Sequence, residues 1–182
     1  GRLGLTQRPA EVAAKQALAA VGQGVLMQRY EGLFGEYGRV VGQVLLTRQD
    51  LEDPGRRASA AAVIERMLAW GVIPIVNEND TVTSEEIRVG DNDTLSARVA
   101  ALIGADLLVL LSDVDGLYPA DPRTTPGLEP LLYARLTDDL ERIAGGAGSA
   151  NGTGGMLTKV SAARICAAAG IAMVLARGER PG

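Results

Sequence analysis

The chain has 182 residues, a length that suits one α/β domain with a real core and is short for two. Aromatic residues are only 3% of the chain, so Ala, Val, Leu and Ile must build that core, as in helices packed closely on a parallel sheet. The net charge is −4 with acids and bases mixed along the chain, which argues against nucleic acid or an anionic membrane as a partner.

The residues that are missing narrow the chemistry further. The chain has no histidine and a single cysteine, Cys166, so it excludes Ser-His-Asp and Cys-His catalysis, zinc clusters and an intrachain disulfide. Any chemistry must therefore rely on carboxylates, amides, lysines and a loosely held cation. No apolar stretch approaches the roughly 20 residues of a membrane span. No signal-peptide pattern opens the sequence, and we expect a cytoplasmic protein.

The first part of the chain is predicted to alternate helices and strands. Apolar residues at i, i+3 and i+4 spacing predict an amphipathic helix, and short β-branched apolar runs predict strands. The expected elements are a helical region over residues 9–37 that Gly22 and Gly24 break in two, a strand over 40–46, a helix over 56–70 ended by Gly71, and a strand over 72–76.

The second part continues the alternation with longer loops. The aliphatic run at residues 107–111 is typical of a strand buried on both faces. We expect a polar loop over 77–91 with a small hairpin at 86–89, a helix over 94–104, a long loop over 114–130, a glycine-rich stretch over 145–155, a helix over 156–169 and a strand over 171–176. This order predicts a three-layer αβα sandwich with a mostly parallel central sheet. Ligands of such sheets bind beyond the carboxyl ends of the strands.

Two polar motifs precede the middle of the chain. The motif NENDTVT, residues 77–83, directly follows a predicted strand, and its amides and carboxylates could hold a zwitterion or simply cap a turn. The motif VGDNDTLSA, residues 89–97, places Asp91, Asn92 and Asp93 at the start of a helix. One of them is expected as the N-cap, and a further Asp could orient lysines or a cation.

Two more motifs lie in the second half. The segment LLVLLSDVDGLYPADPR, residues 107–123, ends a strand in Ser112 and Asp113, which could contact a nucleotide or its metal or merely form a strand exit. The segment GTGGMLTK, residues 152–159, places glycines before a helix N-terminus, where free amides and the helix dipole favour phosphate. Lys159 can project toward the same anion. The pattern is not a Walker motif, and alone it is also typical of a linker.

Taken in order, these four motifs resemble the glutamate 5-kinases of the amino-acid kinase superfamily. The stretches KQALAAVGQG and QVLLTRQD match as well, so the resemblance covers essentially the whole chain. It implies transfer of the ATP γ-phosphate to the side-chain carboxylate of L-glutamate, giving glutamyl 5-phosphate in proline biosynthesis. A carboxylate acceptor is already ionised at neutral pH and needs no general base, which agrees with the missing histidine.

The resemblance also implies roles for individual residues. Asp80 and Asn92 would bind glutamate, with Asn77 lining the same pocket, and Asp93 would organise catalytic lysines that include Lys159. Mg²⁺ would bridge the ATP phosphates, and the protein would form a homo-oligomer. Ser112 stands where relatives often have Thr, and Leu157 where they often have a small polar residue. The implied nucleotide-binding residues are Ser112, Asp113, Thr153, Gly154, Gly155, Met156, Leu157, Thr158 and Lys159.

The chain departs from this family at both ends. It opens at GRLGL, after the strand with a lysine and the phosphate loop that start the family's domain, and it closes at ERPG, before an accessory C-terminal domain. We therefore expect residues 1–182 to be a catalytic domain without those parts, and as an isolated fragment it would be inactive. Within the same fold, acetylglutamate, aspartate, carbamate or uridylate kinase are alternatives, as is the kinase half of a bifunctional pyrroline-5-carboxylate synthase. A non-catalytic ligand-binding module is a further alternative, although the retained Asp93, Asp113 and Lys159 speak against it.

Overall fold

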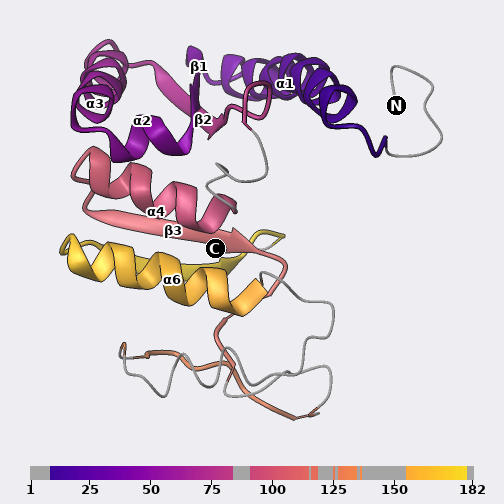
Figure 1. The fold of residues 1–182 in the computed structure, drawn as a ribbon. Coiled ribbons are helices and arrows are strands. Elements are labelled where there is room, and N and C mark those ends of the chain that lie inside the picture. Colours follow the sequence, from indigo (N-terminus) through magenta and orange to yellow (C-terminus); the bar gives the residue numbers. More distant parts are fainter. Residues whose placement is uncertain are drawn as a thin grey trace. The chain divides into compact units, whose positions relative to one another are not determined.

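The computed structural model describes residues 9–83, 91–114, 116–118, 125, 127–134, 136 and 155–179. The chain divides into two compact units, residues 1–89 (unit 1) and 90–182 (unit 2). Each unit contains a two-stranded parallel sheet with helices packed on it (Figure 1). The α/β class with parallel strands, expected from the sequence, is confirmed. Within the described residues, no helix has the length and apolar content needed to cross a membrane.

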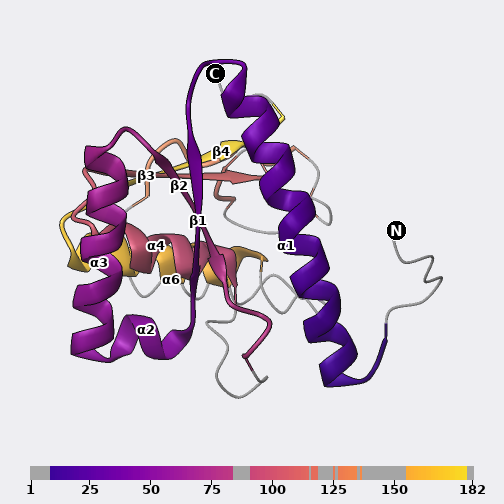
Figure 2. The same cartoon turned by 90° about the horizontal axis from the view of Figure 1, so that it is seen from above.

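Unit 1 is a parallel strand pair joined by two helices. Strand β1 pairs with β2 so that Val41 lies opposite Ile73 and Leu46 opposite Glu78. The long helix α1 and the helix α3 lie on opposite sides of these strands (Figure 2). The elements in order are α1 (Val12–Gly35), β1 (Val41–Leu46), α2 (Arg48–Glu52), α3 (Pro54–Ala69) and β2 (Ile73–Glu78).

The helices between β1 and β2 begin at side-chain caps. Thr47 and Asp50 form a capping box at α2, because the Asp50 amide donates to Thr47 Oγ1 at 3.3 Å and the Thr47 amide donates to Asp50 Oδ2 at 2.8 Å. Asp53 then caps α3 by accepting a hydrogen bond from the Arg56 amide at 2.9 Å. Helix α3 ends at Ala69, with Trp70 as its C-cap, and Gly71 follows with a φ of 72°, which only glycine adopts without strain. The short helix α2 was not predicted, whereas α3 and its end at Gly71 are confirmed.

The predicted break in the first helical region is wrong, because α1 runs unbroken from Val12 to Gly35. Gly22 and Gly24 lie inside it, and a Cβ built on either would meet nothing within 4 Å. Glycine inside a helix costs only about 1 kcal/mol relative to alanine, and neighbouring Ala, Leu and Gln residues are good helix formers. The two glycines therefore weaken the helix without ending it.

Unit 2 builds its core from small side chains. Strand β3 pairs with β4 in parallel, with Leu107 opposite Ala172 and Ser112 opposite Arg177. Helices α4 and α6 pack against each other and against the strands (Figure 1). The elements are α4 (Asn92–Leu102), β3 (Leu107–Ser112), α6 (Gly155–Ala168) and β4 (Ala172–Arg177). The buried core consists of Ala97, Ala100, Leu110, Ala162, Cys166 and Ile171.

The prediction that β3 is buried on both faces is wrong. Leu110 is 6% exposed, but Leu107, Val109 and Leu111 are 51%, 46% and 60% exposed. The two sets alternate because successive side chains of a strand point to opposite faces. Both α4 and α6 cover the face that carries Leu110.

Most other boundaries differ from the prediction by one or two residues. The polar loop begins later than expected, because Asn77 and Glu78 are the last residues of β2. The loop after β3 contains an antiparallel bridge in which the Leu131 amide donates to the Leu117 carbonyl at 2.7 Å. Gly155 belongs to α6 rather than to the glycine-rich stretch. The predicted hairpin at 86–89 and residues 145–154 lie outside the described residues.

Candidate active site

At the start of α4, two aspartates that are close in sequence have different hydrogen-bond partners. Asp91 is the N-cap, and its carboxylate accepts hydrogen bonds from the Thr94 amide at 2.7 Å and from Thr94 Oγ1 at 2.9 Å. Asp93 lies within the first turn, where Ser96 Oγ donates to its backbone carbonyl at 2.9 Å. Since Asp91 alone provides the cap, the carboxylate of Asp93 can interact with another helix.

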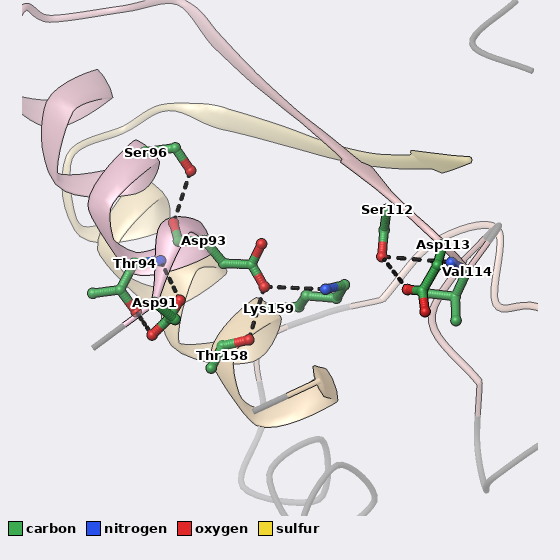
Figure 3. A network of polar contacts seen from close by, with 9 residues as sticks. All are labelled: Asp91, Asp93, Thr94, Ser96, Ser112, Asp113, Val114, Thr158 and Lys159. Atoms are coloured by element: carbon green, nitrogen blue, oxygen red, sulfur yellow. Dashed lines mark hydrogen bonds and ion pairs between the residues drawn. The ribbon is translucent and has the colours of Figure 1, made fainter. Parts of the chain in front are cut away.

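That carboxylate binds two side chains at the start of α6. Thr158 Oγ1 donates to Asp93 Oδ2 at 2.7 Å, and Lys159 Nζ lies 3.0 Å from the same oxygen (Figure 3). The Lys159 side chain is 11% exposed and that of Asp93 is 24% exposed. The ion pair is therefore largely shielded from water, so that its electrostatic attraction is stronger than that of a surface pair.

The dipoles of the two helices affect the two charges of this pair in opposite ways. A negative charge in the first turn of α4 is favourable, because the N-terminus of a helix carries a partial positive charge. Lys159 lies near the N-terminus of α6, where a positive charge is unfavourable unless an anion is close. Asp93 supplies that anion. The ammonium of Lys159 and the partial positive charge at the start of α6 lie near each other, and both can attract a phosphate.

A second polar pair lies at the carboxyl end of β3. Ser112 Oγ donates to Asp113 Oδ1 at 3.0 Å, and Val114 N lies 3.5 Å from Ser112 Oγ (Figure 3). The Ser112 hydroxyl, the backbone amide of Asp113 and the positive charge of Lys159 lower the pKa of the fully exposed Asp113 carboxyl. Asp113 is therefore an anion throughout the neutral pH range.

In unit 1, the polar motif after β2 forms a turn with its own hydrogen bonds. Thr83 Oγ1 donates to the Asn79 carbonyl at 2.6 Å, and Gln16 Nε2 of α1 donates to the Thr83 carbonyl at 3.4 Å. Asn77 Oδ1 accepts a hydrogen bond from the Glu78 amide at 2.9 Å. Asp80 is half-buried within this turn. The turn thus fixes the backbone around Asp80 on both sides.

The structure brings together only some of the predicted site residues. Asp93, Thr158 and Lys159 are in direct contact, and Asp113 is close enough for the charge of Lys159 to affect its pKa. Asn77 and Asp80 belong to unit 1, whereas the exposed Asn92 belongs to unit 2. In α6, Met156 packs on Val160 while Leu157 is 47% exposed, and Thr153 and Gly154 lie outside the described residues.

Sequence reasoning missed two sets of contacts made by residues of unit 2. It did not predict that Thr158 would bind the carboxylate of Asp93, although a hydroxyl next to a candidate lysine was a usable signal. It also missed Arg177, which pairs in register with Ser112 at the end of β4 and forms an ion pair with Glu179 at 3.0 Å. Strand pairing between segments so distant in sequence could not be read from either segment alone.

The arrangement of the described residues is typical of α/β proteins that bind phosphate. A parallel α/β unit with a carboxylate-held lysine at the start of a helix, directly after a glycine-rich segment, has the features of a phosphate-binding site. Comparison with known proteins makes this specific. The model of the amino acid kinase family matches residues 2–177, and the chain belongs to that family.

Curated relatives match the chain over nearly its whole length. It is 81% identical over 181 residues to the glutamate 5-kinase of Symbiobacterium thermophilum, a match that covers 100% of this chain and 69% of the relative. It is 51% identical over 180 residues to the glutamate 5-kinase of Caldanaerobacter subterraneus subsp. tengcongensis, covering 98% of this chain and 48% of the relative. It is 52% identical over 181 residues to the glutamate 5-kinase of Clostridium acetobutylicum, covering 99% and 68%. The chain thus spans between about half and about two thirds of the length of these relatives.

Proposed function

We propose that this chain is the catalytic part of a glutamate 5-kinase, which transfers the γ-phosphate of ATP to the side-chain carboxylate of L-glutamate. The observation that carries the proposal is 81% identity, over the whole chain, to a protein of that name. The ion pair between Asp93 and Lys159 supports it, because phosphoryl transfer requires a fixed positive charge beside the phosphate.

The reaction makes few demands on acid–base chemistry. An oxygen of the glutamate side-chain carboxylate forms a bond to the γ-phosphorus, and the bond from that phosphorus to the bridging oxygen of ADP breaks. The products are glutamyl 5-phosphate and ADP, and no proton has to be removed from the acceptor. The protein's task is to align the reactants and to balance the charge of the phosphoryl group. A chain without histidine can perform it.

We assign the phosphate side of the reaction to unit 2. Lys159 would contact the transferring phosphoryl group, and Asp93 would hold its ammonium in place. The exposed carboxylate of Asp113 and the hydroxyl of Ser112 would contact the nucleotide at the end of β3. The backbone of the segment 153–159 would surround the phosphates, with the N-terminus of α6 directed at them.

The described residues offer Mg²⁺ few protein ligands. Among the described residues, no three Cys, Asp or Glu side chains lie close enough together to form a metal site. Mg²⁺ keeps several waters and commonly binds through substrate phosphates together with one or two carboxylates. We propose that it binds with the phosphates of ATP, where it would neutralise part of their charge, and that Asp113 is the described carboxylate available to it.

For glutamate, we propose Asp80, Asn92 and Asn77 as ligands, the roles that the family resemblance implies for them. A carboxylate such as Asp80 suits the ammonium group of an amino acid, and amides suit its carboxylate. The hydrogen-bonded turn from Asn79 to Thr83 supports this role, because it holds the backbone on either side of Asp80. We further propose that the protein is cytoplasmic and that it forms a homo-oligomer. Sedimentation of the complete gene product over a range of concentrations would test the oligomeric state.

Trapping of the acyl phosphate with hydroxylamine tests the function directly. The complete gene product is incubated with ATP, Mg²⁺ and L-glutamate, and hydroxamate is measured. Formation that depends on glutamate and is lost in Lys159→Ala supports the proposal, and Ser161→Ala, an exposed position on the same helix, is the matched control. Consumption of ATP with acetylglutamate, aspartate, carbamate or uridylate instead of glutamate would leave the family assignment intact and refute the substrate.

A further inference from the structure

We infer that Thr158 is a positioning residue, which holds Asp93 in the orientation that fixes Lys159, rather than a ligand of the nucleotide. The inference rests on the proposed function and deepens it. It follows from one geometric fact: two neighbouring side chains of α6 bind the same carboxylate oxygen of α4. Thr158 Oγ1 lies 2.7 Å and Lys159 Nζ lies 3.0 Å from Asp93 Oδ2 (Figure 3).

The hydrogen-bonding capacity of the hydroxyl decides between the two roles. A threonine hydroxyl has one hydrogen to donate, and a carboxylate can only accept. The hydrogen of Thr158 is therefore directed at Asp93 and is not available to a phosphate oxygen, which is also only an acceptor. A phosphate ligand at this position would have to break the bond to Asp93 first.

Lys159 needs such support because of its flexibility. Its ammonium sits on a four-carbon stem with many rotamers, and a single contact to a carboxylate fixes it poorly. A carboxylate can also rotate about its Cβ–Cγ bond. The short hydrogen bond from Thr158 restrains that rotation and keeps Oδ2 facing α6. Since Thr158 is neutral, it adds this restraint without reducing the positive charge that Lys159 presents.

The backbone strengthens the restraint. Thr158 and Lys159 are consecutive residues of α6, so their Cα positions are fixed relative to each other by the helix. On the other side, Ser96 Oγ holds the Asp93 carbonyl at 2.9 Å within α4. The hydroxyl of Thr158 therefore ties together two rigid elements, and its loss should loosen the lysine without unfolding either helix.

Steady-state kinetics of the complete gene product separate the two roles. For Thr158→Val, which removes the hydroxyl at nearly constant volume, we expect kcat to fall by about 10-fold to 100-fold, because small misplacements of a catalytic group cost that much, while KM for ATP changes little. Thr158→Ser should restore most of kcat. Adding Thr158→Val to Asp93→Asn should cost little more, since the hydroxyl acts through that carboxylate. The inference is overturned if Thr158→Val mainly raises KM for ATP, or if its effect adds fully to that of Asp93→Asn.

A second readout does not depend on the substrate. Trace acetylation of the protein with acetic anhydride, followed by mass spectrometry, gives the relative reactivity of Lys159. We expect this reactivity to rise severalfold in Thr158→Val and in Asp93→Asn, and to stay at the wild-type level in Thr158→Ser and Ser161→Ala. Unchanged reactivity in Thr158→Val would refute the positioning role. If the wild type does not phosphorylate glutamate, the proposed function fails, but this labelling still decides the role of Thr158.

Discussion

Asp93 Oδ2 lies 3.0 Å from Lys159 Nζ, and each residue stands near the start of its own helix, in α4 and in α6. The contact links a carboxylate that is favourably placed by its helix dipole to a cation that is unfavourably placed by its own. The ion pair therefore holds the ammonium of Lys159 near the start of α6. A substrate phosphate would meet that charge together with the amides at the start of α6.

Replacing Lys159 should abolish most activity. For Lys159→Ala we expect kcat for acyl phosphate formation to fall by about 100-fold to 1,000-fold, the usual effect of removing one group that stabilises transition-state charge. Arg164→Ala is the control, because it removes an exposed positive charge from the same helix. Equal losses in both variants would mean that the general charge of α6, and not the Asp93-bound lysine, matters.

Asp113 should make nucleotide binding independent of pH in the neutral range. Its pKa is lowered, chiefly by the hydrogen bond from Ser112, so the charged form is favoured and its contribution is lost only as the pH falls below the ordinary aspartate range of about 3.9. We therefore expect a constant KM for MgATP from about pH 5 to 8. Asp113→Asn should raise that KM by about 10-fold, the value of one hydrogen bond to a charged group. A KM that varies over this range in the wild type but not in Asp113→Asn would contradict the assignment.

The capping box after β1 should make stability depend on acid pH. The pKa of Asp50 is lowered, first by the hydrogen bond from the Thr47 hydroxyl and then by the Thr47 amide and Arg56, whose Nη1 lies 2.8 Å from Asp50 Oδ1. A carboxylate with a lowered pKa stabilises the fold above the unfolded value of about 3.9, and this stabilisation is lost as the pH falls through the folded value.

Urea unfolding of the wild type and Asp50→Asn should therefore differ at pH 7 and converge toward pH 3. Thr47→Ala should lower the free energy of unfolding at pH 7 by about 1 kcal/mol, the usual cost of losing an N-cap. A difference between wild type and Asp50→Asn that grows on acidification would show the opposite linkage.

Two glycines of unit 1 should respond oppositely to alanine. Gly24→Ala fills open space inside α1 and should raise the free energy of unfolding by about 0.5–1 kcal/mol, because alanine loses less backbone entropy. At Gly42 in β1, a Cβ would overlap Met67 Cε and lie 3.3 Å from Val72 Cγ1. Gly42→Ala should therefore lower the free energy of unfolding by about 1 kcal/mol, because the flexible end of Met67 and the neighbouring Val72 must both shift. Thermal unfolding of the two variants measures both effects, and a neutral Gly42→Ala would mean that Met67 moves freely.

Local patterns in the sequence predicted the elements that depend on local chemistry. The apolar runs of β1 and β2, the periodicity of α3 and the stop at Gly71 were sufficient, because each is decided within a few residues. The short helix α2 was missed, since its capping box depends on Thr47 and Asp50 alone and no apolar periodicity marks so short a segment. The predicted break at Gly22 and Gly24 gave too much weight to glycine and too little to its neighbours.

Contacts between distant segments lay beyond such patterns. The aliphatic run of β3 does not reveal that α4 and α6 pack on the same face and leave Leu107, Val109 and Leu111 exposed. In the site, the residue patterns before two helices marked Lys159 and one Asp of residues 91–93 as candidates, and the family resemblance singled out Asp93. Their contact, and the bond from Thr158 to the same oxygen, depends on how two helices dock and had to come from the structure.

The parallel pairing of β3 with β4 also sets the order in which the site can assemble. Leu107 lies opposite Ala172 and Ser112 opposite Arg177, so a long intervening segment must be closed before either strand gains its partner. Closing a long loop costs entropy, and contacts of this kind slow folding. On the ribosome, α4 and β3 emerge well before α6 and β4. The Asp93 carboxylate therefore cannot bind Thr158 and Lys159 until α6 has emerged. Formation of the Asp93–Lys159 ion pair would therefore report that the last part of unit 2 has been synthesised and docked.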